Sequence, residues 1–288
     1  MRERLFRLTL EYDGTAYQGF QRLPRQEAPT IQGVLEQALG RLVDHPVKVL
    51  AAGRTDAGVH ATGQVISFRT RAARSAAVVC RGANALLPED IRVLEASEAP
   101  DDFHPRFSAR SRTYQYLLLP SPRLDAVFTR RAWRLSHALD VERMNEAARR
   151  LLGRHDFSTF CAQVPETDGR VRNLLECEAV RWAGPAPGPL ARLEGLVVLQ
   201  VRADAFLRRM VRMLTGTLVK VGRGLWEPEE PRRILDLRDP GACPAPAPPW
   251  GLYLVSVEYG AGLGREGQEA SQTSEGPPGS STPGGQAR

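Results

Sequence analysis

The sequence predicts an α+β protein made of two ferredoxin-like α/β units with mainly antiparallel sheets. Residues 4–96 show strand and helix patterns in the order β-α-β-β-α-β, which is the order of such a unit, and further strand and helix patterns begin near residue 103. A chain of 288 residues is long enough for two units. We therefore expect an N-terminal unit over 1–102, a C-terminal unit over 103–259 and a disordered low-complexity tail over 260–288.

The elements of the N-terminal unit follow from hydrophobic periodicity. Residues 4–12 alternate apolar and polar side chains, which is typical of a half-buried strand. Thr30 precedes an apolar stripe of helical spacing and is a suitable N-cap, and Pro88 ends a second helix over 75–87. The remaining strands are expected at 47–51, 64–68 and 91–96.

The C-terminal unit begins with a strand over 111–119, in which Tyr114 and Tyr116 share one face. Asp140 is a suitable cap for the next helix, which Gly153 is expected to close. The Pro- and Ala-rich segment 240–249 is predicted to lack regular structure. Further strands are expected at 171–181, 196–203 and 250–259, and helices at 206–221 and 229–237.

Composition is that of a soluble globular protein, with 42% hydrophobic and 25% charged residues. No apolar run approaches the roughly 18 residues of a membrane span, and the N-terminus has no signal-peptide core. We therefore expect a cytoplasmic protein that does not enter a membrane.

A metal site is not expected. The four cysteines contain no C-x-x-C pair, which argues against a zinc site and a disulfide framework. The histidines are equally scattered. The residues concerned are Cys80, Cys161, Cys177 and Cys243, with His45, His60, His104, His137 and His155.

A basic balance points to nucleic acid as the partner. The net charge is +6 and the pI about 9.5, and arginines gather in three places along the chain. Grouped arginines suit phosphate recognition, although they also occur on ordinary solvated surfaces. The groups are Arg69, Arg71 and Arg74; Arg106, Arg110 and Arg112; and Arg202, Arg208, Arg209 and Arg212.

Residues 53–60, named here the catalytic loop, combine a carboxylate, a guanidinium, a hydroxyl and an imidazole between two glycines. Gly53 and Gly58 allow sharp turns that bring these side chains close to a ligand. A plainer alternative is a polar turn in which Asp56 caps backbone N–H groups. The loop by itself leaves both interpretations open.

Several segments together resemble the bacterial TruA-type tRNA pseudouridine synthases. They occur in register from about residue 5 to residue 259. Besides the catalytic loop they are 11–14, 21–22, 84–88, 101–107, 114–116, 153–160, 206–216 and 251–254. The resemblance implies the pseudouridine synthase fold, in which the two units join around a central basic cleft.

The resemblance also implies a reaction. Family members isomerise uridine to pseudouridine at positions 38, 39 and 40 of the tRNA anticodon stem-loop. They detach the base from its ribose at nitrogen, rotate it and rejoin it through carbon, using no metal, redox cofactor or nucleotide. The implied partner is tRNA, and the family is commonly homodimeric.

Matching positions suggest the roles of individual residues. Asp56 corresponds to the nucleophile and Arg212 to the arginine that pairs with it. Arg54 corresponds to an RNA contact that helps to hold the target nucleotide out of its stack. Tyr114 corresponds to an active-site tyrosine that stacks on uracil or moves protons, and Leu252 to an apolar residue that closes over the base. The resemblance does not distinguish the two roles of Tyr114, or attack of Asp56 on the sugar from attack on the base.

Other residues receive lesser roles from the same comparison. His60 is interpreted as structural and Tyr116 as an ordinary packing residue. The loop 163–170 corresponds to a region that touches the tRNA backbone, but Glu166 and Asp168 make it acidic and it does not match residue for residue. Further expected RNA contacts are Arg74, Phe103, His104, Arg106 and Phe107.

Two other functions compete with this one. A non-catalytic RNA-binding protein would have little use for a carboxylate near phosphate, so Asp56 speaks against it. A glycoside hydrolase with an aspartate nucleophile would need a second carboxylate as general acid, and the matched motifs contain none beside Asp56.

Overall fold

A computed structural model describes residues 2–22, 28–121, 128–162, 169–184 and 193–260 of the chain. Two of the sequence predictions fall outside these ranges. They concern the tail from residue 261 on and residues 163–168 of the expected RNA-contact loop.

The N-terminal half folds as the predicted ferredoxin-like unit. Its strands lie in the order β4-β1-β3-β2, and all neighbours are antiparallel, which is the ferredoxin-like arrangement. Both helices start as predicted, because the hydroxyls of Thr30 and Ser75 accept hydrogen bonds from the backbone N–H groups of Gly33 and Val78. The elements are β1 (Arg4–Tyr12), α1 (Ile31–Val43), β2 (Leu50–Ala51), β3 (His60–Thr70), α2 (Ala76–Leu86) and β4 (Ile91–Ala99).

The C-terminal half repeats this topology. Its strands lie in the order β10-β5-β9-β8-β7, with antiparallel neighbours, and β6 adds to β5 in parallel. The path β5-α3-β8-β9-α4-β10 therefore matches β1-α1-β2-β3-α2-β4 of the first unit. The elements are β5 (Ala109–Pro120), β6 (Trp133–Leu135), α3 (Val141–Arg149), β7 (Gly153–Asp156), β8 (Val171–Arg181), β9 (Val197–Ala203), α4 (Met210–Gly222), α5 (Glu230–Leu237) and β10 (Leu252–Tyr259).

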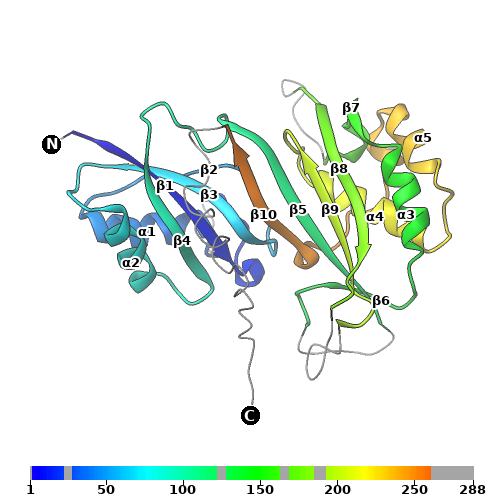
Figure 1. Cartoon of the computed structure of the whole chain (residues 1–288), viewed down its shortest axis with the longest axis horizontal. Coiled ribbons are helices and arrows are strands. Elements are labelled where there is room, and N and C mark those ends of the chain that lie inside the picture. Colours follow the sequence, from blue (N-terminus) through cyan, green and yellow to red (C-terminus); the bar gives the residue numbers. More distant parts are fainter. Residues whose placement is uncertain (1, 23–27, 122–127, 163–168, 185–192, 261–288) are drawn as a thin grey trace, which may run out of the picture.

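One sheet runs through both units, with β10 and β5 near its middle (Figure 1). The junction is a short parallel pairing in which Tyr253 and Leu254 of β10 face His60 and Ala61 of β3. Since β1 occupies one edge of β3, β10 and β2 share the other edge, β10 at the His60 end and β2 near Ser67. The catalytic loop leaves β2 on this shared edge and therefore lies between the two units.

The fold class predicted from the sequence is confirmed. One hydrophobic core takes side chains from the helices of both units, among them Leu35 of α1, Val79 of α2, Met144 of α3 and Leu214 of α4. A smaller cluster gathers around Phe103. The helices of the described residues are too short or too polar to cross a membrane.

Several predicted boundaries were wrong. The helix capped by Asp140 ends at Arg149, and Gly153, with φ of 99°, instead begins β7, which was not predicted; β6 was also missed. Helix α4 begins at Met210 rather than at 206, because Arg209 adopts a left-handed conformation with φ of 62°. Strand β2 has only two residues.

The segment 240–249 also differs from its prediction. It was expected to lack regular structure, but Pro240–Ala242 forms a 3-10 helix and Pro249–Gly251 forms another at its end. Two further 3-10 helices lie at Gly14–Ala16 and Ser158–Phe160.

Candidate active site

Asp56 and Arg212 form an ion pair across the two units. Asp56 lies in the catalytic loop and Arg212 in the first turn of α4, and 2.9 Å separates the Asp56 Oδ2 and Arg212 Nη1 atoms. The Arg212 side chain is only 12% exposed and the Asp56 side chain 30%, so water can still reach the carboxylate. The pair leaves one partly accessible carboxylate at the junction, beside a mostly buried guanidinium.

The backbone of the Pro- and Ala-rich segment 240–249 fixes the Arg212 side chain. Its Nε donates to the carbonyl of Ala247 at 2.7 Å, and the Ala247 N–H donates to the Arg212 carbonyl at 2.9 Å. Ala247 is itself buried. The Nε of the guanidinium is therefore bound to the backbone and its Nη1 donates to Asp56. The two bonds together fix the orientation of the guanidinium.

The catalytic loop is supported from the N-terminal unit. The hydroxyls of Thr55 and Tyr12 lie 2.8 Å apart in the core, and the Gln64 Nε2 donates to the carbonyl of Gly53 at 2.8 Å. The Phe20 N–H donates to the Thr55 carbonyl at 3.0 Å. These contacts hold the residues on either side of Arg54, so the loop is bound on its inner side and open on its outer side.

Of the two glycines in the loop, only Gly58 needs the conformational freedom of glycine, because its φ is 76°. A Cβ at Gly53 would make an ordinary 3.5 Å contact with the Tyr114 hydroxyl. A glycine outside the loop is more restrictive: Gly19 has φ of 85°, and a Cβ there would lie 2.7 Å from the Thr55 carbonyl oxygen.

Tyr114 borders the loop from β5. Its side chain is 8% exposed and packs edge-on against Phe206, and its hydroxyl faces Gly53. Burial, with Tyr12 and Asp56 nearby, raises the pKa of Tyr114 above its ordinary value. The phenol is therefore protonated at neutral pH and can donate a hydrogen bond or a proton, but it cannot start a reaction as a base.

Tyr116 and Leu252 belong to the core beneath the site. The Tyr116 ring is fully buried, packs edge-on against Trp133 and donates its hydroxyl to the Pro248 carbonyl at 2.6 Å. This agrees with the packing role expected for it. Leu252 is 5% exposed and pairs with Tyr116 across the sheet.

His60 has the environment of a structural residue, as expected. Its Nδ1 accepts from the Gly14 N–H at 3.2 Å, its Nε2 lies 3.1 Å from the carbonyls of Arg130 and Trp250, and its ring stacks on Tyr253. Burial outweighs the nearby Asp13 carboxylate and lowers the pKa of His60. The ring thus joins the end of the catalytic loop to three other segments.

The expected RNA contacts near the site differ in accessibility. Arg54 is exposed, and Phe107 is 74% exposed with Arg106 over its ring. His104 organises this turn, because its Nδ1 accepts from the N–H groups of Arg106 and Phe107. Phe103 is 5% exposed and packs on Tyr259, so its ring fills the core and is unavailable to stack on RNA.

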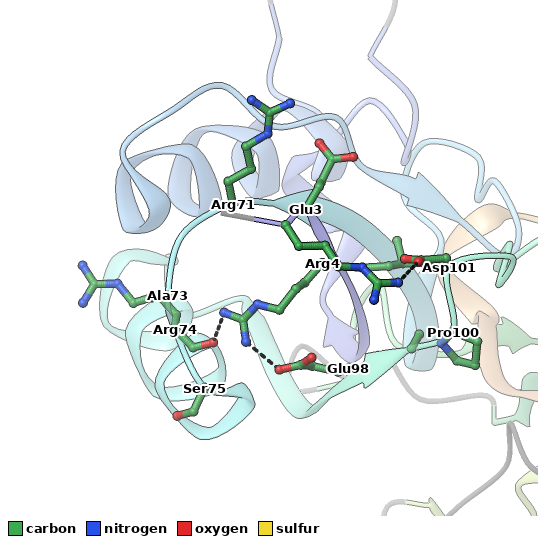
Figure 2. Close-up of a pocket in the computed structure, with 12 residues that line it drawn as sticks. Glu3, Arg4, Arg71, Ala73, Arg74, Ser75, Glu98, Pro100 and Asp101 are labelled. Atoms are coloured by element: carbon green, nitrogen blue, oxygen red, sulfur yellow. Dashed lines mark hydrogen bonds and ion pairs between the residues drawn. The ribbon is translucent and has the colours of Figure 1, made fainter.

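Arg74 follows β3 by four residues, beyond the Thr70 end of the strand, whereas the catalytic loop enters β3 at His60. Arg74 and Arg71 border a hollow of about 720 Å³, in which Arg4 pairs with Glu98 and Arg2 with Asp101 (Figure 2). The structure does not bring Arg74 to Asp56.

The arginine groups singled out in the sequence do not form one phosphate-binding surface. Arg112 is buried, Arg212 binds Asp56, and Arg202 pairs with Glu176 and Glu258. Arg69 lies within 4.0 Å of Glu3 and Asp101. Besides Arg69, the exposed members are Arg71, Arg74, Arg106, Arg110, Arg208 and Arg209.

Among the described residues, no group of three or more His, Cys, Asp or Glu side chains is placed so that it could hold a metal ion. The supporting contacts of Tyr12, Gln64 and Ala247 were not predicted. Tyr12 lies in the matched segment 11–14 and Gln64 in an expected strand, but neither was assigned a supporting contact. Ala247 acts through its backbone, which the sequence does not mark.

Comparison with known proteins gives consistent matches. A family model described as tRNA pseudouridine synthase matches residues 9–108 and 147–260. A protein of Methylacidiphilum infernorum named tRNA pseudouridine synthase A is 42% identical over 256 residues, covering 88% of this chain and 95% of its own. Proteins of the same name from Nitrosomonas eutropha and Vibrio cholerae are 42% and 41% identical, covering 88% and 89% of this chain and 87% and 92% of their own.

Proposed function

The chain belongs to the tRNA pseudouridine synthases, an isomerase family that acts on tRNA, and we propose that it modifies uridines 38, 39 and 40 of the anticodon stem-loop with Asp56 as the nucleophile. The observation that carries this proposal is the Asp56–Arg212 pair. A partly accessible carboxylate paired with a mostly buried guanidinium is suited to covalent catalysis.

The reaction balances within the nucleotide. The bond between ribose C1′ and uracil N1 breaks, a bond between C1′ and C5 forms, C5 loses a proton and N1 gains one. Asp56 forms a covalent adduct at the sugar or at the base and leaves again. Both routes need the same ionised carboxylate, which Arg212 orients.

Tyr114 is proposed to face the extruded uracil. Its hydroxyl lies next to the catalytic loop and its ring is held by Phe206, so the small exposed part of the residue would meet the base there. Its hydroxyl stays protonated and is suited to donate a hydrogen bond in the reaction. Leu252 is proposed to help to exclude water from beneath the base.

The RNA contacts are proposed to extend from the loop to the exposed basic side chains. Arg54 is accessible beside Asp56 and would hold the flipped nucleotide. Phe107 and Arg106 are exposed and would meet the RNA farther from the target, along a basic cleft between the units. Arg74 is exposed on the N-terminal unit and would meet the RNA outside that cleft. Contacts of this kind predict that affinity for tRNA falls steeply as salt is added.

Incubation with unmodified tRNA that carries uridines 38 to 40, followed by chemical mapping of pseudouridine, tests the function. The wild-type chain should modify these positions, and Asp56→Asn should bind the same tRNA with no product. Product from Asp56→Asn would refute the nucleophile assignment. Binding without product by the wild-type chain would instead favour a non-catalytic RNA-binding role.

Three wider features are part of the proposal. The chain is proposed to work in the cytoplasm, where its tRNA substrate occurs, and to divide into units at residues 102 and 103. It is also proposed to be a homodimer, as its family commonly is. Light scattering of the purified protein, with and without tRNA, should give twice the mass of the 31.7 kDa chain before RNA is added.

A further inference from the structure

Arg112 is a buried arginine beneath the catalytic loop. It lies on β5 two residues before Tyr114 and pairs across the sheet with Val257 of β10 and Ala203 of β9. Only 7% of the residue is exposed, although arginine is one of the residue types least often buried. A charged group that is buried in this way needs hydrogen bonds or an ion pair to offset its lost hydration.

The hydrogen bonds of Arg112 go to backbone carbonyls. Its Nη1 donates to Asp204 at 2.7 Å and to Ala109 at 3.4 Å, and its Nη2 donates to Ala52 at 3.2 Å and closely to Arg106. The nearby Asp204 carboxylate is turned elsewhere, since its Oδ1 accepts from the N–H groups of Asn173 and Ala205. The guanidinium thus binds four backbone carbonyls and does not form an ion pair with Asp204.

Three of these carbonyls lead to parts of the proposed site. Ala52 immediately precedes the catalytic loop and lies four residues before Asp56. Asp204 begins the link from β9 to α4, which carries Arg212. Arg106 belongs to the exposed turn next to Phe107. One side chain therefore ties together the segments that carry the nucleophile, its partner and an expected RNA contact.

We propose that Arg112 is a positioning residue for the isomerisation. It fixes the start of the catalytic loop relative to the link between β9 and α4 and relative to the 103–107 turn. The inference rests on the proposed function. It does not place Arg112 in contact with RNA, although the sequence grouped it with phosphate-binding candidates. The ionic partner of the site remains Arg212, and Arg112 acts through the backbone around it.

Lysine cannot replace this geometry. It keeps the charge, but its single ammonium cannot reach four carbonyls that a planar guanidinium meets with two terminal nitrogens. Arg112→Lys should therefore leave the charge in place and loosen the relative positions of the three segments. A misplacement of about 1 Å can reduce a rate about 100-fold without removing the binding surface.

The test compares wild type, Arg112→Lys and the control Arg143→Lys. Arg143 also donates to a backbone carbonyl, that of Trp226, but it lies on α3 away from the site. The single-turnover rate of pseudouridine formation at saturating tRNA should fall about 10- to 100-fold in Arg112→Lys, with the Kd for tRNA changed by less than about threefold. The control should match wild type in both.

A rate within about twofold of wild type, or a loss confined to Kd, would overturn the inference. Arg112→Gln, which keeps two N–H donors without the charge, is the second variant if Arg112→Lys does not fold, and it should show the same separation of rate from Kd. Failure of both to fold would make Arg112 structural only and would also overturn the inference. An inactive wild-type chain would count against the proposed function instead.

Discussion

The two ferredoxin-like units share a topology and differ most in their second strand. In the C-terminal unit this strand, β8, has 11 residues and pairs along β9 in the ordinary way. In the N-terminal unit its equivalent, β2, pairs with β3 over two residues only, and the chain then leaves the sheet as the catalytic loop. Shortening one strand frees the edge of β3 for the loop and for β10.

The helices show the same division. Helix α4 begins beside the loop and carries Arg212, whereas its equivalent α2 begins with Ser75 at the far end of β3. The N-terminal unit therefore supplies Asp56, the proposed nucleophile, on a supported loop, and the C-terminal unit supplies Arg212, which pairs with it. Duplicated topology is compatible with a single site, because the junction brings different parts of the two units together.

The largest expected effect concerns Arg212. Arg212→Met leaves the Asp56 carboxylate without its cation, and the single-turnover rate should fall at least about 100-fold. The control is Arg81→Met in the equivalent helix α2, where the side chain is exposed and the rate should be unchanged. Equal losses in the two variants would contradict the division of roles between α4 and α2.

A second effect separates the tyrosines of the first strands, Tyr114 of β5 and Tyr12 of β1. Tyr114→Phe should lower the rate about 10- to 100-fold with little change in stability, because its hydroxyl has no hydrogen-bond partner among the described residues. Tyr12→Phe removes the contact with Thr55 and should cost about 1–2 kcal/mol in the free energy of unfolding. Urea unfolding and single-turnover assays would measure both; an unchanged rate in Tyr114→Phe would leave that residue a stacking role.

A third effect compares two glycines with positive φ. Gly19→Ala places a Cβ 2.7 Å from the Thr55 carbonyl and should cost about 3 kcal/mol, together with a loss of activity. Gly224 has φ of 69°, and a Cβ there would have no atom within 4 Å. Gly224→Ala should therefore lower the free energy of unfolding by about 1 kcal/mol through backbone conformation alone, and activity should be unchanged. If Gly19→Ala and Gly224→Ala lost the same free energy of unfolding in urea, the backbone at Thr55 would be able to shift away from the added Cβ, and the expected clash would be refuted.

The smallest expected effect concerns His60 and pH. Its pKa is lower when folded than its ordinary value of 6.5, so the folded state binds fewer protons, and stability present above pH 6.5 is lost as the pH falls below it. The slope should not exceed about 1.4 kcal/mol per pH unit. Urea unfolding between about pH 7 and 5 should show this loss in wild type and less of it in His60→Gln.

That pH range also separates His60 from its neighbours. The pKa of Asp13 is lowered from 3.8, so the contribution of that carboxylate is lost only in more acidic solution. A pH slope that is identical in His60→Gln would assign the effect to another group.

Much of the fold could be predicted because periodicity is local. The alternation in residues 4–12 and the stripe after Thr30 follow from which side chains must be buried, and both elements are present. The ends of elements were harder to predict. Gly153 has the positive φ expected of a helix terminator, but α3 ends at Arg149 and Gly153 begins β7. Asp56 was found through its motif, and its pairing with Arg212 was expected only from resemblance.

The amino-acid sequence by itself determined the order of elements, the basic balance and the residue types of the catalytic loop, because each depends on neighbours along the chain. Tertiary structure decided which of them act together. Asp56 meets Arg212 from 156 residues away, Ala247 holds that arginine through its backbone, and Arg112 is withdrawn from the surface to bind carbonyls. Such contacts depend on how β3 and β10 pair, and a backbone carbonyl carries no residue-specific signal in a sequence.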